Sequence, residues 1–167
     1  TADDRVRRTN NSEPRFVGGF NVNLRYKNFD LMALFQGALG AETYIQTWSG
    51  TVGNYLKDFY DKRWTTENPN VEHPRAYERE NQYWISNSNT YFIRSCDYLR
   101  LKNIELGYNI TLPALKNAGI SNARIYVNAT NIFTIDKLKV ADPEADDRNI
   151  TSYPQRRVVN FGVSLTF

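Results

Sequence analysis

The sequence contains few of the residues on which many protein sites depend. Among 167 residues there is one cysteine, Cys96, and one histidine, His73. A single cysteine cannot form a disulfide within the chain, and these two residues are too few to ligate zinc. No obvious general base lies beside Cys96 in the sequence, so we do not expect a catalytic thiol there.

Catalytic and nucleic-acid-binding patterns are also missing from the sequence. The carboxylates are scattered, there is no glycine-rich phosphate loop, and a hydrolytic triad would have to use His73 without any serine motif. The net charge of +3 is mild, and the basic residues do not gather into the stripe that is typical of nucleic-acid binding. We therefore expect a protein that is not an enzyme, holds no cofactor or metal and binds no nucleic acid.

The sequence has no run of the ~20 apolar residues that a transmembrane helix requires. This absence does not exclude a membrane, because each strand of a membrane barrel carries only ~10 residues of alternating character. The chain is rich in tyrosine (11 residues) and phenylalanine (9 residues). Aromatic side chains, and tyrosine above all, suit a surface that is apolar at one end and wet at the other.

Alternation of apolar and polar residues is the main pattern in the chain, and it predicts β-strands. The clearest example is the last segment, in which Val159, Phe161 and Val163 oppose Asn160 and Gly162. The predicted strands are 16–26, 29–37, 99–110, 123–133 and 157–167. Their lengths are close to the ~9–11 residues that a tilted strand needs to cross a bilayer, whereas a soluble strand usually has ~5–6.

The connections between these strands alternate in length. Two residues separate the first pair and a short linker, 111–122, separates the third and fourth, whereas 38–98 and 134–156 are long. Short turns on one side and long loops on the other are typical of outer-membrane barrels. We therefore predict an all-β, transmembrane antiparallel β-barrel with long extracellular loops and a periplasmic C-terminus.

Short helices are expected within these connections. Apolar residues at helical spacing predict a helix over 55–64 in the first long loop. In the linker, Pro113 suits the first position of a helix, and Gly119 suits a left-handed cap that lets Ile120 fold back on Leu115.

Several stretches of the sequence resemble a known family when they are taken together and in order. The strongest is 98–108, Tyr-Leu-Arg-Leu-Lys-Asn-Ile-Glu-Leu-Gly-Tyr. The others are 15–21, 28–37, 63–69, 112–113, 119–120, 124–127, 131–134, 142–144 and the terminal strand. The chain, over nearly its whole length, resembles the C-terminal part of the SusC/RagA family of TonB-linked outer-membrane proteins, which is typical of Bacteroidetes.

The resemblance implies a barrel of about 22 strands filled by an N-terminal plug. It also implies energy from a TonB complex, a SusD-like lipoprotein partner over the extracellular mouth, and import of oligosaccharide or peptide. Residues 1–167 would then be the C-terminal piece of that barrel. The alternative is a soluble β-sandwich carbohydrate-binding module, in which the apolar faces of two sheets would meet each other instead of lipid.

Two sets of residues are candidates for functions at the membrane. The pattern Asn160-x-Gly162-x-x-Leu165-x-Phe167 is similar to the signal by which the barrel-assembly machinery recognises outer-membrane strands, although an ordinary amphipathic last strand would look alike. Aromatic residues near the expected periplasmic rim form a predicted membrane-interface girdle. They are Tyr26, Phe29, Tyr108 and Phe167.

Three further features have two interpretations each. The loop tryptophans Trp48, Trp64 and Trp84 either contact cargo or the lipoprotein, or pack the loop's own core, which is the simpler interpretation. Glu105 faces the lumen, as a hydrated wall residue or as a contact to the plug. An acidic loop suits either calcium or plain solvation, and the missing EF-hand glycine and glutamate favour solvation. The acidic residues are Asp142, Glu144, Asp146 and Asp147.

Overall fold

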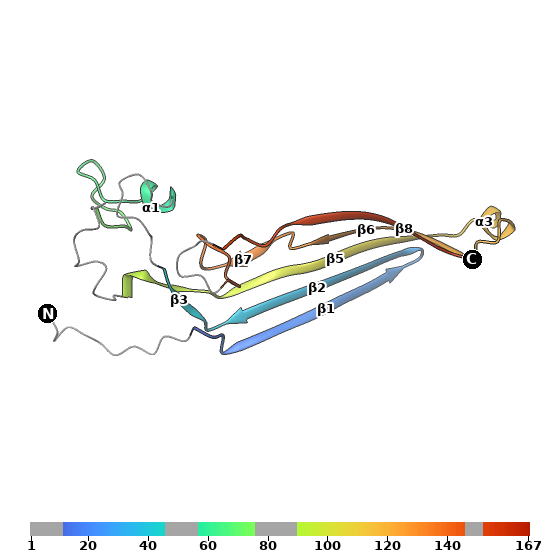
Figure 1. Ribbon diagram of the computed structural model, residues 1–167, viewed down its shortest axis with the longest axis horizontal. Helices are drawn as coiled ribbons and strands as arrows, with labels where there is room; N and C mark the ends of the chain where they lie inside the picture. Colours follow the sequence, from blue (N-terminus) through green and yellow to red (C-terminus); the bar gives the residue numbers. More distant parts are fainter. Residues whose placement is uncertain (1–11, 46–56, 76–89, 146–151) are drawn as a thin grey trace.

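One long antiparallel sheet dominates the protein (Figure 1). The computed structural model describes residues 12–45, 57–75, 90–145 and 152–167. The long strands keep their chain order across the sheet, and each pairs antiparallel with the next. In that order they are β1 (Phe16–Tyr26), β2 (Phe29–Leu39), β5 (Tyr98–Ile110), β6 (Asn122–Thr130) and β8 (Val158–Thr166).

The strand boundaries follow the alternation closely, with one correction. β1 has the predicted bounds, and β2 reaches Leu39, two residues beyond its predicted end. The prediction of one strand over 123–133 is wrong at its end, because β6 stops at Thr130. Asn131 takes a positive φ of 53°, which turns the chain out of the extended conformation. The short strand β7 (Thr134–Asp136) follows this turn and pairs with β5.

The two faces of the sheet differ in chemistry, because successive side chains of a strand point to opposite sides. What we call the apolar face carries Phe20, Leu24, Leu31, Leu106, Val127, Phe161 and Val163. What we call the polar face carries Asn23, Asp30, Glu105, Arg124, Tyr126 and Asn160. On the apolar face the cross-strand register brings like side chains together, as where the ring of Phe20 stacks on Phe35 with centroids 4.7 Å apart. The polar face also holds Met32 and Leu34 of β2, opposite Asn23 and Asn21.

The apolar face is uncovered. Leu24 is 59% exposed and Phe161 is 84% exposed, and nowhere in the described residues does a second sheet lie over them. No large side chain in the same part of the chain is fully buried. A continuous exposed apolar surface marks a site of interaction, so the β-sandwich alternative, in which two apolar faces meet, is not supported.

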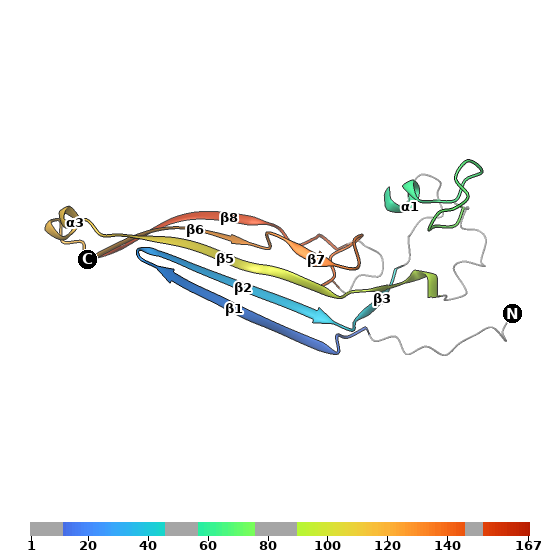
Figure 2. The same ribbon diagram turned by 180° about the vertical axis from the view of Figure 1, so that it is seen from behind.

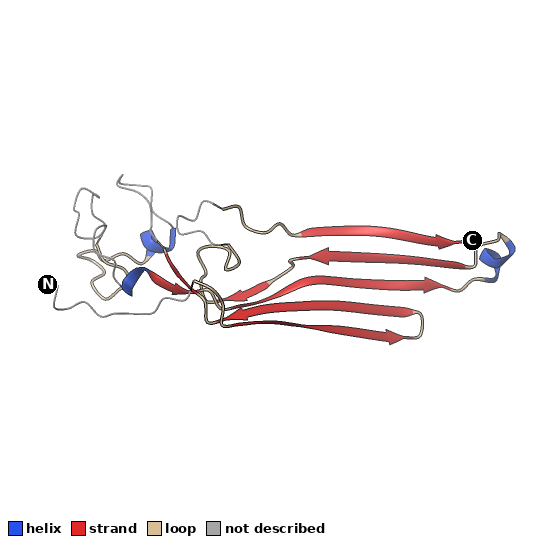
Figure 3. Cartoon of the chain, turned by 60° about the horizontal axis from the view of Figure 1, so that its bottom comes forward, coloured by secondary structure: helices blue, strands red, loops and turns tan. Residues whose placement is uncertain are grey.

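The two ends of the sheet carry connections of different length (Figures 1 and 2). What we call the short-connection end holds the turn at Lys27 and Asn28, the helix α3 (Pro113–Asn117) and the C-terminus (Figure 3). Lys27 completes its turn with a φ of 53° although it is not glycine. The residues between β2 and β5 and between β6 and β8 emerge at the opposite end, which we call the loop end.

The first long connection contains short elements of its own. β3 (Glu42–Tyr44) and β4 (Ile93–Ser95) pair antiparallel, and they are accompanied by α1 (Lys57–Asp61) and the 3₁₀ turn η2 (Thr90–Phe92). The helix expected over 55–64 is thus shorter than predicted at its C-terminal end. None of the helices in the described residues is long and apolar enough to cross a membrane.

A small apolar cluster joins the two long connections at the loop end. Ala41, Ile45 and Cys96 of the first connection are buried together with Leu138 of the second. Cys96 is 7% exposed and therefore contributes to packing as a small apolar side chain. The cluster shows that the loop end has a packed base of its own, separate from the uncovered sheet.

The linker helix α3 begins and ends as the sequence predicts. Pro113 is its first residue, where the missing N–H of proline costs no hydrogen bond. Gly119 has a φ of +77°, and the N–H of Ile120 donates to the carbonyl of Leu115 over 2.9 Å. A left-handed residue at this place lets the chain reverse and satisfies a free carbonyl of the helix end.

The substitution Gly119→Ala tests this cap. An added Cβ would meet no atom within 4 Å, so the whole effect should come from the left-handed backbone, which costs an L-residue about 1–2 kcal/mol. We expect the free energy of unfolding to fall by about 1 kcal/mol, measured by denaturant titration of the protein in detergent. Asn117→Ala, at an exposed helical position two residues earlier, is the control and should change it by less than about 0.5 kcal/mol.

Candidate functional site on the polar face and at the loop end

A charged network crosses three strands on the polar face. The guanidinium of Arg124 on β6 bonds to both oxygens of Asp30 on β2, with Nε 3.1 Å from Oδ1, and to Glu105 on β5 over 2.7 Å. The three side chains, which we call the strand triad, are each about one-fifth exposed (20–23%). Two carboxylates share one guanidinium, so the triad keeps one net negative charge.

Gly107 makes this crossing possible. It lies on β5 between Asp30 and Tyr126, its register partners on either side. A Cβ at Gly107 would collide with the guanidinium of Arg124. The absence of a side chain on β5 therefore lets Arg124 reach over that strand to a carboxylate on β2.

Two asparagines attach the strand triad to the short-connection end. The side-chain amide of Asn28 donates to the carbonyl of Asn109 over 2.9 Å, and the N–H of Asn109 donates to the carbonyl of Asn28 over 2.8 Å. The side-chain amide of Asn109 donates in turn to Asp30 over 3.1 Å. These bonds hold the β1–β2 turn against β5 and orient the carboxylate that Arg124 binds.

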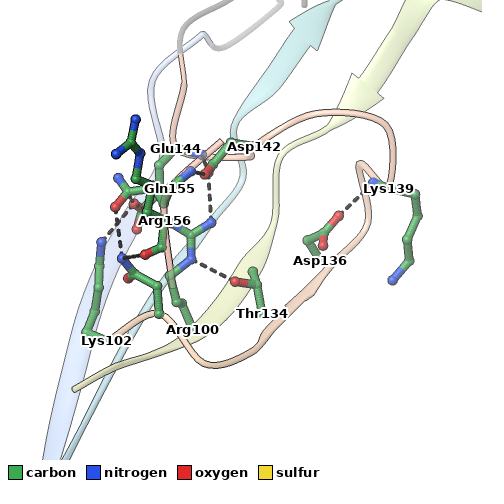
Figure 4. A network of polar contacts seen from close by, with 10 residues as sticks. Arg100, Lys102, Thr134, Asp136, Lys139, Asp142, Glu144, Gln155 and Arg156 are labelled. Atoms are coloured by element: carbon green, nitrogen blue, oxygen red, sulfur yellow. Dashed lines mark hydrogen bonds and ion pairs between the residues drawn. The ribbon is translucent and has the colours of Figure 1, made fainter. Parts of the chain in front are cut away.

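A second charged network, which we call the loop latch, lies at the loop end (Figure 4). Arg100 of β5 is 3% exposed and donates to Asp142 and Glu144, each over 2.8 Å, and to the hydroxyl of Thr134 over 2.7 Å. Lys102 also binds Glu144 over 2.8 Å. Arg100 thus attaches the connection between β6 and β8 to the wall of the sheet.

The loop latch overturns one expectation. The sequence predicts a solvated acidic loop at Asp142 and Glu144, but their side chains are 5% and 14% exposed and are bound by cations. Burial raises the pKa of Asp142, but hydrogen bonds from Arg100 and from the N–H groups of Gln155 and Glu144 outweigh it, so that the pKa lies below its ordinary value. Asp146 and Asp147 lie outside the described residues, and the described ones contain no group of three or more metal ligands.

The single histidine has a structural setting in the first long connection. His73 is 7% exposed, and its ring nitrogens contact the hydroxyl of Tyr91 over 2.7 Å and Asp58 over 3.1 Å. Hydrogen bonds from Lys62 and His73 lower the pKa of Asp58, and burial raises the pKa of Tyr91 to about 12. His73 therefore joins α1 to the segment before β4, and nothing in the sequence indicated these partners.

The four residues of the predicted assembly signal lie along β8 and just beyond it. Asn160 donates its side-chain amide to Asn128 over 2.9 Å, and Gly162 is the register partner of Tyr126, both on the polar face. Leu165 and Phe167 are 48% and 83% exposed. Among the described residues, β8 is an edge strand with β6 as its sole partner.

Three of the four predicted interface aromatics meet in a row at the short-connection end. Tyr26 and Phe29 are register partners, and the rings of Phe29 and Tyr108 are 4.7 Å apart between centroids. Phe167 follows β8 at the same end but is separated from this row by β6.

Of the three tryptophans, only Trp64 lies within the described residues. Its side chain is 36% exposed, and its backbone N–H donates to the carbonyl of His73. Trp48 and Trp84 lie outside them.

The chain is similar in sequence to two curated proteins from Formosa agariphila. It is 32% identical to TonB-dependent receptor P3 over 100% of its own length, and 30% identical to TonB-dependent receptor P26 over 92%. It spans less than one-fifth of these relatives, 18% and 17% of their respective lengths. No protein-family model matches the chain.

The fold is similar to that of solved structures of the RagAB peptide importer. The closed-closed state superposes with a TM-score of 0.77 and the open-open state with 0.73, each at 26% sequence identity. In both, the match covers 100% of this chain and 19% of the other. The sheet described above is therefore a segment of the same kind of barrel.

Acid should open the loop latch, and Asp142→Asn should remove part of this response. Because the pKa of Asp142 is lowered in the folded protein, its contribution is complete above the ordinary value of ~3.9 and is lost as the pH falls through the folded value. We expect the amide protection factors of residues 134–145 to fall between pH 7 and pH 3. In Asp142→Asn they should be low at both pH values, since breaking a buried ion pair costs about 3 kcal/mol.

Asp136→Asn is the matched control for this measurement. Asp136 lies in β7 of the same connection, and its exposed carboxylate accepts the N–H of Lys139 over 2.6 Å. It takes no part in the loop latch, so this variant should keep the wild-type protection at pH 7. Equal protection in Asp142→Asn and wild type would contradict the role assigned to the latch.

Proposed function

Because the chain belongs to the SusC/RagA family of TonB-dependent receptors, we propose that it forms part of the wall of an outer-membrane barrel that imports nutrients. The single observation that carries this proposal is the uncovered apolar face of the long sheet. Strands of 9–13 residues are long enough to cross a bilayer when tilted. Lipid is the partner that suits an exposed apolar face on strands of this length. The opposite, polar face would then line the water-filled lumen of the barrel.

The proposed orientation places the short-connection end in the periplasm. Outer-membrane barrels have short periplasmic turns and long extracellular loops, and the turn at Lys27, helix α3 and the C-terminus lie together at one end (Figure 2). The row Tyr26, Phe29 and Tyr108 then lies at the periplasmic interface of the membrane, where amphipathic aromatic rings are favoured. Phe167 lies at the same end, four residues beyond Val163, which is the residue of β8 in register with this row.

The loop end is then extracellular and is the place for cargo and a partner. We propose that the connections 38–98 and 134–156 contact a SusD-like lipoprotein and the imported molecule, with energy supplied through a TonB complex. The solved relatives are peptide importers by name, which favours peptide over oligosaccharide as the cargo. Trp64, with Trp48 and Trp84, is a candidate contact to either the cargo or the lipoprotein.

The polar face lines the lumen in this proposal. The strand triad offers one net negative charge there, close to the periplasmic end. A plug domain that fills the barrel is the natural neighbour of Glu105 and Asp30. A basic side chain of the plug would add to Arg25, the register partner of Asp30, in offsetting the charge that Arg124 leaves. Arg100, on the same face, fixes the loop latch over the extracellular end of the lumen.

We also propose that the C-terminal strand is recognised during barrel assembly. As an edge strand it offers free backbone groups for pairing, and its alternate apolar residues suit a binding surface. Asn160, Gly162, Leu165 and Phe167 are the residues assigned to this recognition.

The proposal predicts opposite tolerance to charge on neighbouring residues of β1. Val22 and Asn21 lie near the middle of the sheet, on the apolar and polar faces respectively, at the level of Ile104 and Asn103. Val22→Lys should lower the amount of folded receptor in the outer membrane, because a lysine at the lipid face near the midplane costs about 2–4 kcal/mol. Asn21→Lys, which faces a hydrated lumen, should leave it nearly unchanged.

The measurement is the quantity of heat-modifiable receptor in purified outer membranes, compared for the two full-length variants. Equal effects of the two lysines would contradict a lipid-facing apolar side, and recovery of the intact wild-type receptor in the soluble fraction would contradict the membrane location. Uptake of labelled peptide and labelled oligosaccharide by cells with and without the receptor then distinguishes the two kinds of cargo.

A further inference from the structure

The register of the terminal strand is not fixed by its apolar pattern. A slip of β8 by one residue would move every apolar side chain to the wrong face, and the alternation excludes it. A slip by two residues keeps Val159, Phe161 and Val163 on the apolar face. Some feature other than hydrophobicity must therefore select the observed pairing of β8 with β6.

One cross-strand pair on the polar face can distinguish the observed register from one shifted by two residues. Gly162 lies opposite Tyr126, and a Cβ built on Gly162 would meet the tyrosine hydroxyl at 2.5 Å and the ring atom Cε1 at 2.7 Å. The residues before and after it on this face, Asn160 and Ser164, both carry a Cβ. A slip by two residues in either direction would place one of them beneath the ring.

The position of the tyrosine ring is itself restrained by its neighbours. The guanidinium of Arg124 lies 5.1 Å from the ring centroid and is held in place by the strand triad. On the other side along β6, Asn128 accepts a hydrogen bond of 2.9 Å from Asn160. The ring therefore has a defined place on β6, and Gly162 is the residue of β8 that leaves room for it.

We propose that Tyr126 and Gly162 form a register lock, which selects one alignment of the terminal strand from those that the alternation allows. The inference rests on the proposed function, in which β8 is a strand of the barrel wall, and it assigns positioning roles to both residues. Gly107 beneath Arg124 is the same device on the other side of β6, since that glycine also leaves room for a β6 side chain.

Cross-strand disulfides in the full-length receptor report the register. Val127 faces Phe161 in the observed pairing, and it would face Val163 or Val159 after a slip by two residues in one direction or the other. Directly opposed residues of antiparallel strands have Cα atoms ~4.5–5.5 Å apart, which suits a disulfide. Three receptors are needed, each with cysteine at 127 and at 159, 161 or 163, in a Cys96→Ala background.

The decisive variant exchanges two residues and keeps the composition constant. Gly162→Ser combined with Ser164→Gly moves the position that lacks a Cβ by two residues along β8. The wild-type sequence should cross-link through the 127/161 pair, whereas the exchanged sequence should cross-link through 127/163. The yield of intramolecular disulfide in purified outer membranes, read as a shift in gel mobility, is the measurement.

Two further variants keep this test decisive. Exchange of Ser164 and Thr166 (Ser164→Thr with Thr166→Ser) alters the same face without moving the glycine, so cross-linking should stay at 127/161. If the glycine exchange prevents assembly, adding Tyr126→Ala should restore it, because the obstructing ring is gone. Cross-linking that stays at 127/161 after the glycine exchange, or assembly that Tyr126→Ala does not restore, would overturn the register lock.

Failure of the lock is distinguishable from failure of the proposed function. The cross-link reports strand pairing and does not depend on cargo or on TonB. If the glycine exchange moves the cross-link to 127/163 while the wild-type receptor shows no uptake activity, the import function is contradicted and the register lock is supported. A receptor that imports cargo but keeps the 127/161 cross-link after the glycine exchange would contradict the lock and leave the import function supported.

Discussion

The backbone hydrogen-bond ladder between the long strands is the interaction on which the rest of the structure depends. The register runs without a break from Phe16 with Leu39 to Tyr26 with Phe29. Antiparallel ladders also join the other neighbours, with one irregularity between β2 and β5. No large side chain in the described residues is fully buried, so the sheet is not held by a packed core. Backbone groups that are satisfied within the sheet are the condition for placing such strands in lipid.

Local alternation explains why the strands can be predicted and where the prediction fails. Each strand shows its two faces in its own sequence, so the predicted bounds of β1 match the observed ones. The end of β6 at Thr130 could not be predicted, because Asn131 adopts a left-handed conformation that its neighbours in the sequence do not require. The helix predicted over 55–64 is too long at its C-terminal end because the chain leaves the helix after Asp61, and the backbone N–H of Trp64 bonds to the carbonyl of His73 instead of continuing the helix.

The charged networks could not be predicted because their partners are distant in the sequence. Arg124 and Asp30 are 94 residues apart, and Arg100 and Asp142 are 42 residues apart. Alternation places Glu105 on the polar face but does not name Arg124 as its partner, since that contact depends on the register of two further strands. The acidic loop looks solvated in the sequence for the same reason, because the cation that binds it comes from β5.

The loop latch nevertheless has a signal in the sequence. Leu99 and Leu101 are apolar at odd positions, whereas Ile104 and Leu106 are apolar at even ones, so the alternation changes phase near Lys102. The structure has an irregularity there, since Leu34 pairs with Asn103 and Phe35 with Leu101, leaving Lys102 without a register partner. A bulge of this kind shifts all later side chains by one face. It is this shift that turns Arg100 toward the polar face, and with Lys102 beside it two cations reach Glu144. A break in the phase of a strand pattern therefore marks the place where the wall of the sheet binds its loop.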